Sequence, residues 1–404
     1  MAQNRFSRRE FIEKSCAILG TVGIAGTLFE RNMKPGQSGF LKKSEPKEEN
    51  FDFEKARKKF KEIEKAGFTA HDAMYWEKAP DGRIKCTLCP TYCILRPYER
   101  GRCHVRLSLE NRLATLVYGR PCSVAIDPIE KKPVFNLLPG STAFSLATAG
   151  CLLGCRYCQN WQISQALPEE TDSYDLPPEI AVKSALSEGC KSIAYTYTEP
   201  TIFYEYMLDI CKLAKKSNLR NVMVSCGYIN SEPLKELLPY LDVLKVDLKG
   251  FTEKFYRVVC GGRLEPVLNT LKTAAQSNVL IDIVTLIVPT YNDDLETLKK
   301  MFEWIVKNVG TKICIFLTRF HPTFQLQNLP PTSLTTLEAA RDSALKAGLK
   351  FVYLGNVPGN PAENTFCPKC GKKIIGRLGC QVLSIAIEKG KCKFCGEPIP
   401  GIWE

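Results

Sequence analysis

Short apolar runs alternate with amphipathic stretches from residue 142 onward. The apolar runs have the length of strands and span 144–148, 193–197, 222–225, 243–248, 281–288, 313–318 and 351–354. The stretches between them have helical spacing and span 178–187, 201–216, 233–238, 265–277, 295–307 and 334–346. Strands that alternate with helices indicate βα units and a parallel sheet. We therefore predict an α/β fold whose sheet closes, fully or partly, into a barrel of the (β/α)6 type.

Cys151, Cys155 and Cys158 lie on one short segment directly after the first predicted strand. Three thiolates at this spacing can hold three corners of a cubane iron–sulfur cluster, whereas a closed cluster takes four Cys ligands. The fourth iron can then bind a substrate or cofactor, as in catalytic metal sites that keep one position open. The alternatives are three buried free thiols or a zinc site with a ligand from elsewhere. The dense grouping of the thiols favours the cluster.

Polar residues follow several of the other predicted strands. In α/β barrels the active site lies at the carboxyl ends of the strands, where the βα loops meet. Each residue taken alone could be a helix cap or one half of an ion pair. Their common position at one rim predicts a functional site. The residues concerned are Thr198, Glu199, Thr201, Ser225, Asp247, Lys249, Arg319, His321 and Asn356.

Two further cysteine groups flank the predicted barrel. The C-terminal group is a pair of C-x2-C motifs, made of Cys367, Cys370, Cys392 and Cys395. Two such motifs facing each other can bind zinc tetrahedrally, so we predict a zinc-ribbon-like tail, with a rubredoxin-like iron site as the alternative. The N-terminal group is made of Cys86, Cys89, Cys93 and Cys103. It predicts a second metal site, with zinc, an auxiliary cluster and four free thiols all left open.

Most of the 19 cysteines fall into such groups, which indicates metal ligation rather than disulfides in an enzyme-sized chain. The scattered ones are predicted to be small buried hydrophobes; they are Cys122, Cys190, Cys211, Cys226, Cys260 and Cys314. A net charge of +12 could indicate an anionic partner. However, Lys and Arg alternate with acidic residues, as in 55–62, so we expect a solvated helix face and no nucleic-acid partner.

Residues 1–28 differ in composition from the rest of the chain. Arg8 and Arg9 precede a mildly apolar stretch at 15–29, an order that resembles a twin-arginine export leader. The stretch is too short and too rich in glycine to predict a transmembrane helix. The sequence leaves two locations open. One is export, with membrane contact only through the leader. The other is the cytoplasm, where a low-potential electron donor for an iron–sulfur cluster is expected.

These patterns divide the chain into five predicted parts. They are the leader (1–28), a polar linker with a helix at 52–66 (29–82), an N-terminal Cys-rich segment (83–140), the barrel (141–356) and the ribbon-like tail (357–404). The helix is predicted from the spacing of Phe53, Phe60 and Ile63, with Asp52 as its N-cap.

From about residue 85 to residue 403 the sequence resembles the radical S-adenosylmethionine (SAM) superfamily. Within it, the sequence is similar to the radical SAM enzyme of the AmmeMemoRadiSam system, which is related to pyruvate formate-lyase activating enzymes. The resemblance rests on the Cys151 triplet and on several further motifs. These are Cys86-x2-Cys89-Pro90, Gly101-x-Cys103-x-Val105-Arg106, Tyr195-Thr196-Tyr197-Thr198-Glu199-Pro200-Thr201, Gly355-Asn356-Val357-Pro358-Gly359 and the terminal ribbon.

The resemblance implies two cofactors, a [4Fe–4S] cluster and SAM. The cluster ligands would be Cys151, Cys155 and Cys158. Glu199 would accept the amino group of SAM, Ser225 would contact the ribose, and Tyr157 would lie beside the adenine. Asp247-Leu248-Lys249 is similar to the Asp-Leu-Lys element of glycyl-radical-enzyme activases, which adds Asp247 to the implied cofactor site.

The resemblance also implies the reaction. One electron would cleave SAM to methionine and a 5′-deoxyadenosyl radical, which would abstract hydrogen from a substrate that the sequence does not identify. The implied partners are a low-potential donor such as a flavodoxin or ferredoxin, and Memo-like proteins of the AmmeMemoRadiSam system. Two alternatives stay open: an activase acting on a protein glycine, and an iron–sulfur or zinc module for electron transfer or nucleic-acid binding.

Overall fold

The computed structural model describes residues 52–404, so the predicted leader and the linker up to residue 51 lie outside the described residues. Contacts divide the chain into two units, Met1–Lys58 and Lys59–Glu404. Helix α2 (Phe53–Lys65) begins in the first unit, where the Asp52 side chain accepts a hydrogen bond from the Lys55 backbone N–H over 2.9 Å. This bond is the N-cap contact expected at the start of a helix, so the predicted helix and its cap are confirmed.

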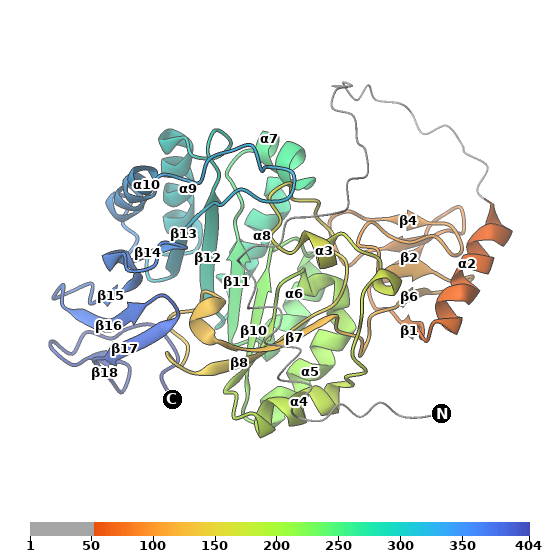
Figure 1. Ribbon diagram of the computed structural model, residues 1–404, viewed down its shortest axis with the longest axis horizontal. Coiled ribbons are helices and arrows are strands. Elements are labelled where there is room, and N and C mark those ends of the chain that lie inside the picture. The colour runs from red at the N-terminus through yellow and green to blue at the C-terminus, as the bar shows by residue number, and fades with distance from the viewer. Residues whose placement is uncertain (1–51) are drawn as a thin grey trace, which may run out of the picture. The chain divides into compact units, whose positions relative to one another are not determined.

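An eight-stranded sheet forms the centre of the second unit, in the order β14-β13-β12-β11-β10-β9-β8-β7 (Figure 1). Its strands from β8 to β14 are parallel, and each pairs with the next along the chain. They are β8 (Thr142–Ala147), β9 (Ser192–Tyr195), β10 (Arg220–Ser225), β11 (Val243–Asp247), β12 (Leu280–Ile287), β13 (Cys314–Arg319) and β14 (Phe351–Gly355). The predicted parallel sheet is confirmed.

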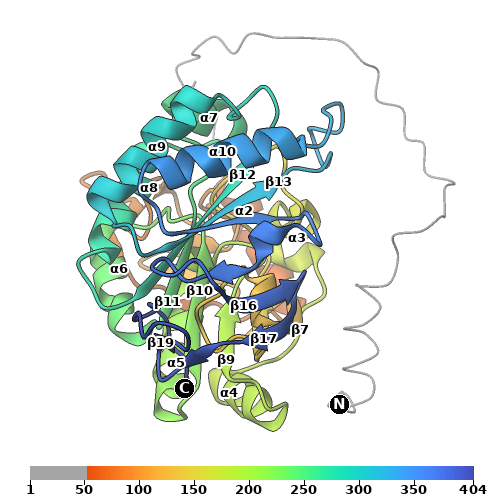
Figure 2. The ribbon, with the colours of Figure 1, turned by 90° about the vertical axis from the view of Figure 1, so that its left-hand side faces the viewer.

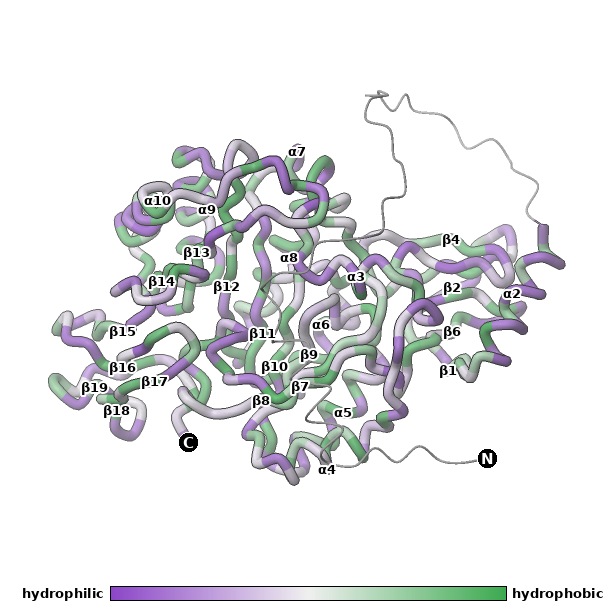
Figure 3. The backbone as a smooth tube through the Cα atoms, in the orientation of Figure 1, coloured by the Kyte–Doolittle hydropathy of each residue, from purple (hydrophilic) through white to green (hydrophobic). Residues whose placement is uncertain are grey.

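Helices connect the parallel strands. The main ones are α4 (Pro178–Ser187), α5 (Tyr204–Lys216), α6 (Ser231–Leu237), α8 (Leu264–Ala274), α9 (Leu295–Asn308) and α10 (Leu334–Lys346). Shorter pieces are α3 (Trp161–Ser164), α7 (Glu253–Phe255) and the π-helix η5 (Tyr256–Cys260). Helix α10 packs on β13, β14 and α9, and α4 packs on α5 and β9. Because helices cover the strands, the strands are almost continuously buried, and they are mostly apolar with single polar residues between (Figure 3).

Strand β7 (Ser123–Pro128) was not predicted. It pairs antiparallel with β8, from Ser123 opposite Ala147 to Pro128 opposite Thr142. The two outer strands of the sheet are therefore β7 and β14, and they do not pair with each other. The sheet stays open between them, so the predicted partial barrel is confirmed.

Residues 71–115 form two small antiparallel sheets, which begin before the predicted Cys-rich segment (83–140) and leave its last part to the main sheet. One contains β1 (His71–Asp72), β6 (Leu113–Thr115) and β5 (Arg106–Ser108), and the other contains β2 (Trp76–Lys78), β3 (Ile84–Cys86) and β4 (Ile94–Leu95). Phe60, Ile63 and Phe68 pack on the first sheet, against Leu107 and Leu116. The buried Arg106 guanidinium forms an ion pair with Glu205 of α5, which fixes the segment to the barrel.

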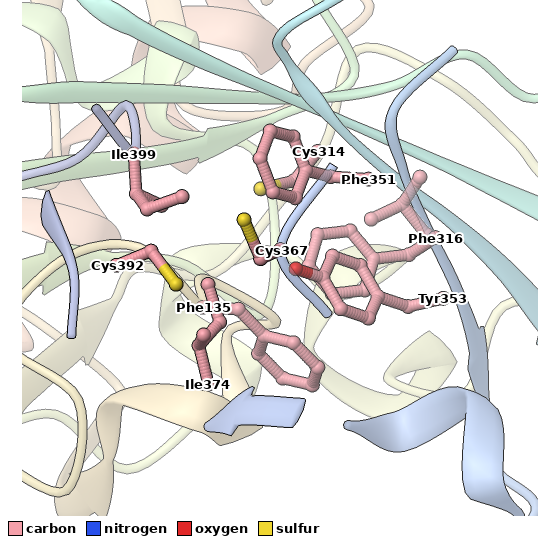
Figure 4. Packing of buried hydrophobic residues seen from close by; sticks show 10 residues of the cluster. Phe135, Cys314, Phe316, Phe351, Tyr353, Cys367, Ile374, Cys392 and Ile399 are labelled. Carbon is pink, nitrogen blue, oxygen red and sulfur yellow. The ribbon is translucent and has the colours of Figure 1, made fainter. Parts of the chain in front are cut away.

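The C-terminal tail packs on the opposite side of the main sheet from the two small sheets (Figures 1 and 2). It contains β15 (Thr365–Phe366), β16 (Lys373–Leu378), β17 (Gln381–Ile385), β18 (Ile387–Glu388) and β19 (Lys391–Cys392). Figure 4 shows the apolar cluster that joins the tail to the barrel: Cys367, Ile374, Cys392 and Ile399 of the tail meet Phe316 and Tyr353 of the sheet around Phe135. The tail and the barrel therefore share one core.

None of the helices in residues 52–404 is both long and apolar enough to span a membrane.

Replacing Phe135 by Ala should lower the free energy of unfolding by about 3–5 kcal/mol, because this ring fills the joint between tail and barrel. Its centroid lies 4.7 Å from that of Phe316 and 4.8 Å from that of Tyr353. Chemical denaturation followed by tryptophan fluorescence measures the loss. The matched control is Phe394→Ala, because Phe394 lies in the same tail but is 49% exposed. Equal stability losses in the two variants would contradict the shared core.

Candidate active site

A cavity of about 460 Å³ lies at the carboxyl ends of the parallel strands. Its wall includes the three cysteines of the triplet, which follow β8. It also includes residues from or directly after each of the remaining parallel strands, β9 to β14. The predicted site residues that line it are Cys151, Cys155, Cys158, Tyr157, Thr198, Glu199, Asp247, Lys249 and Asn356. Parallel strands bring these side chains together because their carboxyl ends meet at one edge of the sheet.

The triplet loop is held by its backbone on both sides. Gly150 has φ +92°, and a Cβ at this position would collide with the backbone carbonyl of Cys103. Only glycine suits this combination of positive φ and close approach. Farther along, the Gly154 and Arg156 N–H groups donate to the carbonyls of Cys260 and Val259, each over 2.9 Å. The loop is thus fixed between the Cys-rich segment and the π-helix η5.

The three thiols of the triplet experience different electrostatic surroundings. A hydrogen bond with Cys260 lowers the pKa of Cys155 to about 7; burial opposes this shift and the Lys249 charge supports it. Burial raises the pKa of Cys151 well above its usual range, and the nearby Glu199 charge adds to the rise. Burial also raises the pKa of Cys158, whose Sγ lies 3.2 Å from the Ser164 hydroxyl. Cys155 is therefore the thiol of this group that ionises most readily.

Glu199 is buried in the wall of the cavity and accepts four hydrogen bonds. Its Oε1 receives the Thr201 N–H (3.1 Å), the Thr201 hydroxyl (2.7 Å) and the Ser225 hydroxyl (2.7 Å). Its Oε2 receives one, from the Cys226 N–H over 2.8 Å. Oε2 thus keeps capacity for another donor, and Oε1 fixes the orientation of the carboxylate.

Ser225, which the resemblance assigns to the ribose of SAM, is buried and does not line the cavity. Its hydroxyl lies behind Glu199 and donates to it. His321 is exposed and also lies outside the cavity wall. Ser225 and His321 are therefore not part of the cavity wall, whereas Glu199 and Asp247 are.

Asp247 lies between two lysines at the cavity wall. Lys245 Nζ bonds its Oδ1, and Lys249 Nζ lies 3.3 Å from its Oδ2. Burial favours a higher pKa for Asp247, but the charges of Lys245 and Lys249 outweigh burial and hold the pKa below its usual value. The carboxylate of Asp247 is therefore held in place by two cations.

Sequence reasoning missed residues of this wall, among them Tyr197 and Cys226, and one residue behind it. Tyr197 has φ +65°, an uncommon conformation for a tyrosine, and its hydroxyl donates to the buried Asp127. Cys226 lines the cavity and Cys260 contacts the Tyr157 hydroxyl at 3.6 Å, although both were predicted only as buried hydrophobes. Tyr197 could have been predicted, because it directly precedes the predicted site residues Thr198 and Glu199. No sequence pattern predicts a role for Cys260.

The predicted C-terminal cysteines lie together. The Sγ atoms of Cys367 and Cys395 are 3.6 Å apart, and those of Cys370 and Cys392 are 3.8 Å apart. All four atoms lie within 4.8 Å of one another, so the group could hold a metal ion. The four N-terminal cysteines line a separate small cavity, together with Leu152 and Arg106.

Two comparisons with known proteins identify the family. The profile of the Radical SAM superfamily matches residues 145–305. An uncharacterized protein of Methanocaldococcus jannaschii is 42% identical over 330 residues, which cover 81% of this chain and 98% of that protein.

The chain belongs to the radical SAM superfamily.

Other relatives include the pyruvate formate-lyase-activating enzyme of Clostridium pasteurianum, 25% identical over 43% of this chain and 72% of that enzyme. Among solved structures, a radical SAM methyltransferase from Sphaerobacter thermophilus is similar with a TM-score of 0.44 and 12% identity, over 72% of this chain and 77% of that one.

Membership of the radical SAM superfamily implies a [4Fe–4S] cluster and SAM, and the residues of the cavity fit both. The thiols of the triplet face one cavity, and they supply one ligand fewer than a closed cluster needs. Glu199 has an oxygen with free acceptor capacity in the same cavity, which suits an ammonium group.

Replacing Asp247 by Asn should lower the free energy of unfolding at pH 7 by about 1.5–3 kcal/mol, because hydrogen bonds to two charged partners are lost. A carboxyl group with a lowered folded-state pKa stabilises the fold above its unfolded pKa of about 3.9, and this contribution disappears as the pH falls through the folded-state pKa. The difference between wild type and variant should therefore shrink below about pH 4.

Urea denaturation of the metal-free protein at several pH values measures this difference. Asp342→Asn is the control, because Asp342 is exposed on α10. A difference between wild type and Asp247→Asn that does not change with pH would contradict the ion-pair account.

Proposed function

We propose that this protein is an enzyme that cleaves SAM reductively and uses the resulting radical to abstract hydrogen from a substrate. The observation that carries the proposal is the common cavity of the cysteine triplet and Glu199. A three-thiol loop and a buried carboxylate are the groups needed to hold a cluster with one open iron and an amino acid bound next to it. When bound, the cluster and SAM supply a low-potential electron and a cleavable S–C5′ bond, giving methionine and a 5′-deoxyadenosyl radical.

In this proposal, Cys151, Cys155 and Cys158 hold the cluster, and Glu199 binds the methionine ammonium of SAM through Oε2. The hydroxyl of Ser225 positions the carboxylate of Glu199, which we favour over direct contact with the ribose because Ser225 lies behind that carboxylate. Tyr157 stays assigned to the adenine side, because it lines the same cavity. A preformed carboxylate costs little reorganisation on binding.

The substrate is proposed to bind in the same cavity, beside the cations Lys245 and Lys249. Two lysines flank a single carboxylate at this point of the wall, so a substrate with an anionic or strongly polar group would find a cationic partner here. Phe316 and Leu354 form an apolar part of the wall. Apolar walls exclude water and protect a reactive radical from side reactions.

A second candidate is an activase that transfers the radical to a glycine of a partner protein. The similarity to the pyruvate formate-lyase-activating enzyme of Clostridium pasteurianum favours it. A glycyl-radical signal in electron paramagnetic resonance (EPR), found on a partner protein, would distinguish this candidate from an enzyme for small molecules. Both candidates need a low-potential donor such as a flavodoxin or ferredoxin. Memo-like partners remain proposals based on the AmmeMemoRadiSam resemblance.

We further propose zinc as the metal of the C-terminal four-cysteine group. A tetrahedral ion with Zn–S bonds of about 2.3 Å separates its sulfur ligands by about 3.8 Å. The distances of 3.6 and 3.8 Å match this spacing. Iron in a rubredoxin-like site has a similar ligand set, so metal analysis has to separate the two. The function of such a site is to stabilise the tail.

Anaerobically reconstituted protein with dithionite and SAM should release 5′-deoxyadenosine, and Cys155→Ala should reduce this release by at least about 100-fold, because a cluster bound by two cysteines is poorly held. Chromatography of the products measures the reaction. Cys190→Ala is the control, since Cys190 is a buried cysteine outside the cavity. Undiminished 5′-deoxyadenosine formation by the Cys155→Ala variant would falsify the proposed function.

Glu199→Gln should weaken SAM binding by about tenfold or more, because the ion pair with the ammonium is lost. Equilibrium dialysis with labelled SAM measures the affinity, and the iron content should stay at the wild-type level. The exposed Glu232 provides the control variant, Glu232→Gln. Equal SAM affinity in Glu199→Gln and wild type would show that another group binds the ammonium.

A further inference from the structure

We propose that Cys86, Cys89, Cys93 and Cys103 hold a second [4Fe–4S] cluster, closed by four protein ligands and next to the loop of the triplet. This inference goes beyond the proposed SAM chemistry; its electron-transfer role and the expected total iron content rest on the cluster proposed for the triplet. The four cysteines come from the end of β3 and from the two loops that follow, and their thiols line one internal cavity. Four thiols around a common space are the ligand set of a closed cubane cluster.

The spacing of the thiols separates this site from the C-terminal one. Within residues 52–404, the C-terminal group is the only set of three or more His, Cys, Asp or Glu ligand atoms that all lie within 4.8 Å of one another. The N-terminal thiols are spread more widely around their cavity. One zinc ion needs sulfur atoms about 3.8 Å apart, whereas a cubane places a separate iron behind each thiolate and so accepts a wider arrangement.

The surroundings of the cavity suit a buried cluster. Leu88, Leu95, Leu152 and Ile202 form apolar walls and are each at most 3% exposed. The Arg102 N–H donates to Cys93 Sγ, and Arg106 Nη1 donates to Cys86 Sγ, each over 3.5 Å. Hydrogen bonds to cluster sulfur atoms tune the reduction potential of iron–sulfur clusters.

Arg106 adds an independent indication of a ligand. Its side chain is 2% exposed and lines the cavity, yet its Nε has no hydrogen-bond acceptor among the described residues. A buried polar donor normally has a partner. The inorganic sulfides of a cluster are acceptors, and the guanidinium charge would offset the negative charge of four thiolates. Neither free thiols nor a single zinc ion supplies such an acceptor beyond the four cysteine sulfurs.

The site lies directly beside the triplet. The Cys103 carbonyl packs on Gly150, and Leu152 lines the N-terminal cavity while its neighbours Cys151 and Leu153 line the main one. A closed cluster has no open iron to bind a substrate, so its function would be one-electron transfer. A low-potential one-electron carrier would reduce this cluster by one electron, and the cluster would return to its oxidised state by passing that electron to the triplet side.

The test is iron, sulfide and zinc analysis of anaerobically reconstituted full-length protein, with EPR after dithionite reduction. Wild type should contain about 8 iron, 8 sulfide and one zinc per chain. A variant with Cys151, Cys155 and Cys158 all replaced by Ala should keep about half of the iron and sulfide and show the EPR signal of a reduced cluster. Cys89→Ala/Cys93→Ala should also lose about half, and Cys190→Ala should lose none.

Wild-type protein with about 4 iron and two zinc, or a triplet variant without iron and sulfide, would overturn the second cluster. The iron, sulfide and zinc content of wild-type protein tests for the second cluster even if a variant fails to fold. Failure of the proposed SAM chemistry would look different: full iron and sulfide content with no 5′-deoxyadenosine. Addition of SAM should change only one of the two EPR signals in wild type, because only one cluster has an open iron.

Discussion

Seven parallel strands must end at the same edge of one sheet, and the candidate site depends on this constraint. The register of the strands places Glu199 after β9, Cys226 after β10 and Asp247 at the end of β11 around one cavity. Residues as far apart in the sequence as Cys151 and Asn356 meet there without any contact specific to each pair. A shift of one strand by a single residue would turn its side chains to the other face and remove them from the cavity.

The parts of the site that were predictable from the sequence are those fixed by local spacing and by strand ends. The triplet is a local motif, and Glu199 and Asp247 were found because an apolar run stops directly before or at them. Cys260 could not be found, because the π-helix η5 brings it to Cys155 from a distant part of the chain. Ser225 shows the limit of strand-end reasoning, since a residue at the rim can face a neighbouring side chain instead of the cavity.

The fold was predictable to a similar degree. Strand and helix alternation from β8 to β14 follows from hydrophobic periodicity, because covered parallel strands are continuously apolar. Strand β7 escaped prediction because Ser123–Pro128 mixes apolar residues with a buried aspartate, Asp127, whose charge is balanced by Lys132. That ion pair forms only in the folded chain, so the segment has no strand pattern of its own.

The tail contributes to the cavity as well as to the core. Glu363, Gly379 and Cys380 all belong to the tail, and all three line the main cavity. The turn between β16 and β17 is thus part of the wall near which a substrate would bind. Consequently, the tail is more than a structural appendage of the barrel, because a change in this turn would alter the shape of the cavity itself.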